Sequence, residues 1–430
     1  MGDLYSALGL GEQARAHYQR DLDIAERLAA AEPGRADYQR DLAVSHERMG
    51  DLYRALGLGE QARASFQRSL DISERLAAAE PGRADYQRDL SVSHNRMGDL
   101  YSALGLGEQA RASFQRSLDI IEPLAAAEPG RADYQRDLSV SHNKMGDLYS
   151  ALGLGEQARA SFQRSLDIRE RLAAAEPGRA DYQRDLSVSH NKMGDLYRAL
   201  GLGEQARASF QRALDIIERL AAAEPGRADY QRDLSVSHIK MGDLYRAPRT
   251  WSERASSSER STSSNASPQP SWTRRLPEGP RRLTQQDGRP VQRPRTWTQA
   301  RASFQRSLDI FERLAAAEPG RVDYQRDLSC SYQRMGFLHV GEENKADALR
   351  FFQKDLGIAE RLAAAEPLRA DYQIDLVSSL MTVAQLRGRE GVGELRRALA
   401  ILHALKGENR LPPTHEPWIA KIEAMLGGVQ

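Results

Sequence analysis

The chain has 430 residues and a single cysteine, Cys330, so it holds no intramolecular disulfide. No spacing of cysteine and histidine resembles a zinc site. The apolar runs are far too short to cross a membrane, and no basic segment followed by a hydrophobic core opens the sequence. These absences exclude a disulfide scaffold and a zinc domain, and we expect a cytoplasmic protein.

Net charge is nearly absent as well. Lysine and arginine number 61 and aspartate and glutamate 60, which gives a formal net charge of +1. Such a balanced mixture produces no overall field that would attract nucleic acid or an anionic membrane. The length would suit two or three globular domains, unless the chain is a stacked array in which each unit packs only on its neighbours.

What the sequence does contain is a phrase that recurs every 48 residues. Met-Gly pairs stand at Met1, Met49, Met97, Met145, Met193 and Met241, each opening the phrase Gly-Asp-Leu-Tyr. A repeat this regular indicates an interaction surface and not an active site, because catalysis needs one unique cluster of side chains.

Each period predicts two helices. Apolar residues recur at three- and four-residue steps over 85–104, and again from 108 to about 127. The linker Gly105-Leu106-Gly107 breaks the first helix, and Pro129-Gly130 ends the second. A lone hairpin cannot bury both apolar stripes, so successive hairpins are expected to stack into an all-α solenoid.

The spacing within the period resembles the tetratricopeptide repeat. Small, aromatic, Gly, Ala and aromatic residues follow one another at the intervals of that motif in at least three periods: Gly50, Tyr53, Gly57, Ala62 and Phe66; Gly98, Tyr101, Gly105, Ala110 and Phe114; Gly146, Tyr149, Gly153, Ala158 and Phe162. The resemblance covers the chain apart from 248–299. The period is longer than the usual one of about 34 residues, as in kinesin light chains and bacterial signalling scaffolds. It implies an α-solenoid of stacked antiparallel helix hairpins, with a right-handed superhelical course.

The resemblance also implies where a partner binds, because the first helix of each pair lines the concave groove in this family. The groove positions are then Asn95, Arg96, Asp99, Asn143, Lys144, Asp147, Asn191, Lys192, Asp195 and Arg198. The family's best-known mode grips a peptide carboxylate with lysine and asparagine. Here aspartate would repel a carboxylate, so a polar or basic peptide, or a helix, suits the groove better. The alternative is that these are solvated surface residues.

A column of histidines occupies the position where the motif usually has tryptophan. Its members are His46, His94, His142, His190 and His238. Such a column could bind metal or sense pH, but we expect the histidines to pack between the two helices. No metal ligands, cofactor or catalytic residues are predicted. The Leu-Gly-Leu-Gly phrase lacks the strand and lysine of a phosphate loop, and paired acids such as Asp119 and Glu122 indicate a solvated face.

Residues 248–299 break the pattern with a basic tract rich in Ser, Arg and Pro, which reads at first as a disordered linker or nucleic-acid arm. Codons for Arg260–Pro270, read two bases later, can encode the sequence found at Leu214–Ala223. Similar shifts recover repeat sequence from 271–280 and 286–294. We therefore expect this segment to be a frameshifted repeat, which shifted reading of the nucleotide sequence would test. The helix ending near Tyr245 should then pair with the helix resuming at Ala300.

The ends of the chain depart from the regular unit. Met1 falls halfway along a first helix, which suggests a start further upstream or a fragment. At the other end, residues 341–344 rebuild the turn, and helices are expected at about 369–387, 392–405 and 417–426. Such divergent units suit a cap.

The predicted organisation is thus a repeat array at 1–247, a disordered insert at 248–299 and resumed repeats with a divergent cap at 300–430. We expect a non-enzymatic scaffold that binds a protein or peptide partner in its groove. Three alternatives stay open: the sensor arm of a larger bacterial signalling protein such as an NTPase or caspase-like protease, a nucleic-acid binder acting through the basic insert, or a decayed product without function.

Overall fold

The structure is a computed structural model that describes residues 11–246 and 295–428, and helices account for its regular structure throughout these ranges. The regular part of the array consists of α2 (Gly11–Ala31), α3 (Ala36–Ala55), α4 (Gly59–Ala79), α5 (Ala84–Ala103), α6 (Gly107–Ala127), α7 (Ala132–Ala151), α8 (Gly155–Ala175), α9 (Ala180–Ala199), α10 (Gly203–Ala223) and α11 (Ala228–Arg246). After the insert come α13 (Arg295–Ala317), α14 (Val322–Gly341), α15 (Lys345–Ala365), α16 (Ala370–Arg387), η2 (Gly388–Gly391), α17 (Val392–Gly407), η3 (Pro413–His415) and α18 (Pro417–Gly427).

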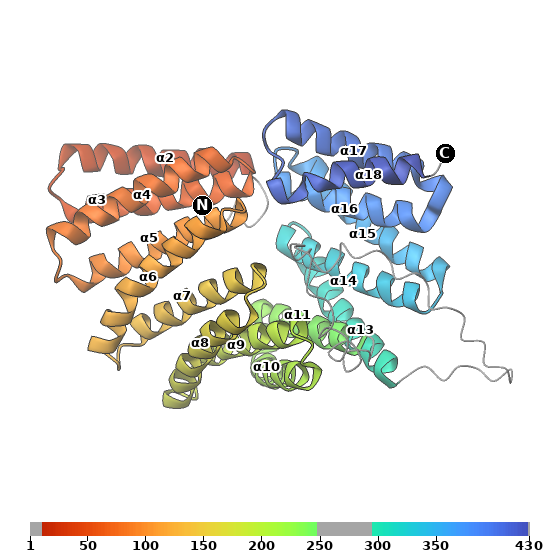
Figure 1. The fold of residues 1–430 in the computed structure, drawn as a ribbon, viewed down its shortest axis with the longest axis horizontal. Helices are drawn as coiled ribbons and strands as arrows, with labels where there is room; N and C mark the ends of the chain where they lie inside the picture. The colour runs from red at the N-terminus through yellow and green to blue at the C-terminus, as the bar shows by residue number, and fades with distance from the viewer. Residues whose placement is uncertain (1–10, 247–294, 429–430) are drawn as a thin grey trace, which may run out of the picture. The chain divides into compact units, whose positions relative to one another are not determined.

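The helices divide into two compact units. The first consists of the described parts of 1–145, 315–330 and 349–430, and the second of the described parts of 146–314 and 331–348. Within the first unit, α2 to α6 lie side by side in alternating directions (Figure 1). The predicted all-α fold of stacked antiparallel helix pairs is confirmed.

The turn between α5 and α6 shows how each hairpin is made. Gly105 adopts a φ of 73°, a left-handed conformation that favours glycine. The amide of Leu106 then donates to the carbonyl of Tyr101 at 2.8 Å, and α6 begins one residue later. Both helices lie within one residue of their predicted bounds.

The two helices of a pair approach closely at a second glycine. A Cβ added to Gly98 would lie 2.4 Å from Cε1 of Phe114, so the ring of Phe114 occupies the space that any larger residue would need. The same packing recurs between Gly194 and Phe210. The small and aromatic positions of the motif are therefore the two halves of one contact.

Helix α11 pairs with α13 in the second unit, as predicted from their two apolar stripes. The hydroxyls of Ser235 and Ser307 lie 2.7 Å apart, and Phe304 is 1% exposed against Gly242. Helix α13 begins at Arg295, five residues earlier than predicted, and its Trp297 packs against Gly341 of α14. The rest of the predicted insert, 248–294, lies outside the described residues, as does Met1.

The last helices form a distinct core in the first unit. Trp418 and Ile422 of α18 are buried with Leu380 of α16 and Leu402 of α17. These helices match the ranges predicted for the divergent end. Over the described ranges, no helix is long and apolar enough to cross a membrane.

Candidate partner-binding face

The candidate site lies on the first helix of each pair, which is α3, α5, α7, α9 or α11. On α5, Arg88, Val92, Arg96 and Asp99 follow one another at steps of three and four residues and therefore share one side of the helix. We call this side, together with the equivalent positions of the other four helices, the first-helix face. It contains the predicted basic and aspartate positions.

The aspartates of this face are paired with cations from the next repeat. Nζ of Lys144 lies 2.8 Å from Oδ2 of Asp99, and Nζ of Lys192 lies 2.8 Å from Oδ1 of Asp147. The equivalent pair of Lys240 and Asp195 is 2.5 Å apart. This lysine–aspartate ladder is completed by Arg96 and Asp51 at 3.5 Å.

The pairing corrects the expectation of a negatively charged strip that repels carboxylates. Each aspartate is neutralised because the lysine 45 residues later reaches back to it. The face offers alternating charges of both signs, and neither sign dominates in the regular repeats.

A second ladder runs along the same face about two turns nearer the start of each helix. Nε of Arg40 lies 2.6 Å from Asp89 and its Nη1 lies 3.4 Å from Asp85. In the other repeats Arg88 pairs with Asp137, and Arg184 with Asp233. The adjacent carboxylates raise the pKa of Arg88 and Arg184, so these arginines are charged at any physiological pH. Sequence reasoning missed this arginine–aspartate ladder, because in a 48-residue repeat an Arg and an Asp recur at many separations and nothing in the spacing singles out 49.

A column of valines separates the two ladders, because each valine lies four residues from the arginine of one ladder and four from the basic residue of the other. The members are Val44, Val92, Val140, Val188 and Val236. Val44 is 46% exposed and Val188 42%, while the other three are partly buried. The face thus has an apolar centre with ion pairs on both sides.

The predicted asparagines lie deeper than expected. Asn95 is 8% exposed and its amide donates to the hydroxyl of Ser141 at 2.9 Å, so it joins α5 to α7 and does not line an open surface. Asn143 and Asn191 are partly buried, and the side-chain carbonyl oxygen of each is buried without a hydrogen-bond partner. From Ser141, hydrogen bonds between serine hydroxyls continue to Ser117 and then to Ser91. Of the predicted residues, the structure therefore brings the charged ones to the surface and holds Asn95 inside.

The histidine column is buried between helices, as expected. His46, His142, His190 and His238 are each 4% exposed. Burial, and secondarily a nearby arginine, lowers the pKa of His46, His190 and His238 to about 4. These three histidines are thus neutral core residues at physiological pH, while His94 is partly buried and Nε2 of His142 lies 3.6 Å from Oε1 of Glu122. Across the described ranges no group of three or more His, Cys, Asp or Glu could hold a metal ion.

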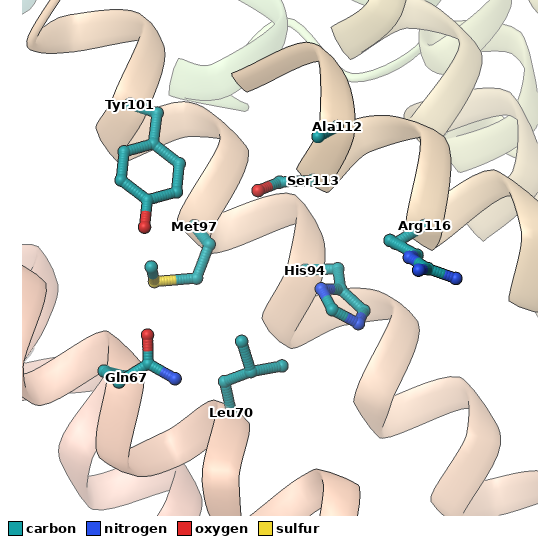
Figure 2. A pocket seen from close by; sticks show the side chains of 8 residues that line it. All are labelled: Gln67, Leu70, His94, Met97, Tyr101, Ala112, Ser113 and Arg116. Atoms are coloured by element: carbon teal, nitrogen blue, oxygen red, sulfur yellow. The ribbon is translucent and has the colours of Figure 1, made fainter. Parts of the chain in front are cut away.

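A small pocket lies away from this face, between α4, α5 and α6 (Figure 2). Its volume is about 160 Å³, and it is lined by Gln67, Leu70, His94, Met97, Tyr101, Ala112, Ser113 and Arg116. No carboxylate is among the lining residues, so His94 has no acidic partner there that would orient it for acid–base work. The pocket offers no arrangement that points to catalysis.

Two segments of the chain match sequence models of the tetratricopeptide repeat, at residues 41–116 and 188–219. These two segments consist of tetratricopeptide repeats. Such repeats imply protein–protein interaction, and the family consists in general of non-enzymatic scaffolds. The first matched segment includes all of α5, with Arg88, Val92, Arg96 and Asp99 of the first-helix face. No curated protein sequence matches the chain.

Several solved structures are similar to this chain in fold. BtubC (BKLC) from P. vanneervenii shares 20% identity, with 61% of this chain and 96% of that chain covered and a TM-score of 0.44. The apo form of RapI shares 11%, with 99% and 95% covered and a TM-score of 0.46. A signal-transduction ATPase with a tetratricopeptide-repeat sensor from Pyrococcus horikoshii shares 14%, with 98% and 50% covered and a TM-score of 0.43. These similarities concern the fold alone.

Proposed function

We propose that the first-helix face binds an extended or helical segment of a protein partner. The observation that carries the proposal is the valine column, which leaves partly exposed apolar positions on the first helices of each unit, at Val44, Val92 and Val140 in the first and at Val188 and Val236 in the second. Isolated exposed valines are ordinary, but a strip repeated at the period of the array is typical of an interaction surface.

The two ladders, which lie on both sides of the valine column, support the same proposal. Protein interfaces combine an apolar centre with a polar rim. Because Lys144 with Asp99, and Arg88 with Asp137, are already paired, the rim carries little net charge. We therefore expect the partner segment to present apolar side chains to the valines, flanked by polar residues. Its affinity should depend weakly on salt.

The experiment compares capture of proteins from lysate of the source cell by three full-length proteins. The test variant changes Val44, Val92 and Val140 to aspartate, which places a charge in the apolar strip of three helices of the first unit. We expect proteins held by the wild-type chain to be lost, with affinity weakened about tenfold or more for a partner whose contacts centre on the strip.

A matched control separates the face from a general effect of added charge. It changes Leu106, Leu154 and Leu202 to aspartate; these leucines are 37–38% exposed and lie in the turns between helices. Circular dichroism must show the same helix content for all three proteins. Retention of the same partners by the valine variant, or their equal loss from both variants, would contradict the proposal.

A further inference from the structure

The lysine–aspartate ladder ends in a cluster that its regular rungs do not have. Asp243 of α11 faces three arginines: Nε of Arg334 at 3.4 Å, Nη2 of Arg246 at 3.7 Å and Nη1 of Arg198 at 3.8 Å. All four residues belong to the second unit. A rung such as Asp147 with Lys192 has one cation for one carboxylate.

Three sequence differences produce this excess. Arg198 and Arg246 stand where the two preceding repeats have Ser102 and Ser150, whereas Arg54 of α3 occupies the same position and pairs with Asp51 at 2.9 Å. On α14, Phe337 follows Met335-Gly336 where the other first helices have aspartate, so the next carboxylate of the ladder is missing. The guanidinium of Arg246 lies 5.8 Å from the ring of Phe337 instead.

The excess of positive charge remains when the neighbouring rung at Asp195 is included. Asp195 pairs with Lys240 and with Arg198. Together the two carboxylates face four cations, Arg198, Lys240, Arg246 and Arg334, which is an excess of two positive charges. Within the described residues, Oδ1 of Asp243 is buried and accepts no hydrogen bond.

The nearby arginines also affect the pKa of Arg246. Burial lowers the pKa of Arg246, Asp243 opposes this shift, and the charges of Arg334 and Arg198 lower the pKa further. In contrast, their carboxylate partners raise the pKa of the ladder arginines Arg88 and Arg184. An added anion would relieve the repulsion among the three guanidinium groups.

From this geometry we infer that Arg198, Arg246 and Arg334 form a binding site for a phosphate group. Guanidinium groups bind phosphate oxygens through paired, charge-assisted hydrogen bonds. A phosphate monoester carries close to two negative charges, which matches the excess of two. The side chains of the three arginines are 30–31% exposed, so an anion can reach them from solvent. This inference does not depend on the proposed binding of a partner at the valine column.

The test titrates the full chain with inorganic phosphate by isothermal calorimetry, at constant and low ionic strength. We expect saturable binding by the wild-type protein. Arg246→Gln and Arg334→Gln should each weaken it about tenfold, because each removes one charge-assisted contact. Arg334→Lys should retain part of the affinity, since it keeps the charge but not the paired hydrogen bonds.

The matched control is Lys192→Gln, which removes one positive charge from a balanced rung. It should bind phosphate as the wild-type chain does. Binding that chloride reproduces, or that Lys192→Gln weakens as much as Arg334→Gln does, would overturn the inference. Loss of binding counts only for variants whose thermal unfolding midpoint matches the wild type, and Arg334→Lys covers the case in which Arg334→Gln fails to fold.

The source of the phosphate group is tested in the same instrument. A phosphoserine peptide is compared with its unphosphorylated form and with inorganic phosphate. Tighter binding of the phosphopeptide would indicate that the phosphate belongs to a partner segment, whereas equal affinity for free phosphate would indicate a small-anion site. Failure of all three to bind would contradict the site itself.

Discussion

At the scale of single residues, Arg169 of α8 departs from the repeat. Its position holds Ile121 in α6 and Ile217 in α10, which are 0% exposed. Arg169 is itself 6% exposed and pairs with Asp185. Removing a guanidinium from water costs free energy that a buried ion pair often does not recover.

The neighbouring repeats supply the comparison that tests this cost. Arg169→Ile should leave the free energy of unfolding unchanged or raise it by about 1 kcal/mol, because isoleucine fills the same space in α6 and α10. Arg169→Ala should lower it by about 2–4 kcal/mol, because alanine leaves a cavity at a position that isoleucine fills in α6 and α10. Urea denaturation followed by circular dichroism measures both. A destabilisation by isoleucine as large as that by alanine would show that the ion pair stabilises the fold.

The buried histidines predict how stability depends on pH. The folded protein holds the pKa of His46, His190 and His238 at about 4, while the unfolded chain titrates near the ordinary value of 6.5. Between these values the unfolded chain binds more protons, so stability is complete above about pH 6.5 and falls as the pH drops toward 4. Each such histidine should remove up to about 2 kcal/mol between pH 7.5 and pH 5.

Urea denaturation of the wild-type chain and of His190→Gln at these two pH values checks the prediction. The variant should lose less stability on acidification than the wild-type chain. Equal losses in the two proteins would assign the pH dependence to other groups.

At the scale of one helix, α6 is the exception among the second helices of the pairs. It contains Pro123, which cannot donate the backbone hydrogen bond of its position. At the same position in α4, α8 and α10, Nε of Arg75, Arg171 and Arg219 donates to a backbone carbonyl four residues earlier, at 3.2–3.3 Å. Compared with these helices, α6 therefore lacks one backbone hydrogen bond and the side-chain hydrogen bond that the arginine makes.

Pro123→Arg should raise the free energy of unfolding by about 1–3 kcal/mol, because it restores the missing helix bond and adds the side-chain bond seen in the other repeats. Arg171→Pro in α8 is the reciprocal change and should lower it by a similar amount. Chemical denaturation of both variants measures the two effects. If Pro123→Arg lowers stability, the end of α6 is adapted to the proline and the comparison between repeats fails.

At the scale of the whole molecule, the sequence predicts the array well because its information is local and repeated. The hairpins, their glycine turns and the packing of Gly98 on Phe114 all follow from spacing within one period. The charged ladders do not, because Asp99 meets Lys144 across a stack of helices whose register the sequence alone does not provide. The sequence places Asn95 at the surface for the same reason, since a step of one residue, about 100° around the helix, separates the ladder residue Arg96 from Asn95, which faces Ser141.

The pairing of α11 with α13 shows how little an interruption of the array costs. Three residues join α9 to α10, whereas 48 residues, 247–294, lie between α11 and α13. By length alone, each doubling of a loop adds about 0.6 kcal/mol of closure entropy, so four doublings add roughly 2.4 kcal/mol. Burying one large apolar side chain such as Phe304 offsets a penalty of that size. An interruption of this length is thus tolerated energetically, so a gene for such an array can acquire additional sequence between two helices and still encode helices that pair across it.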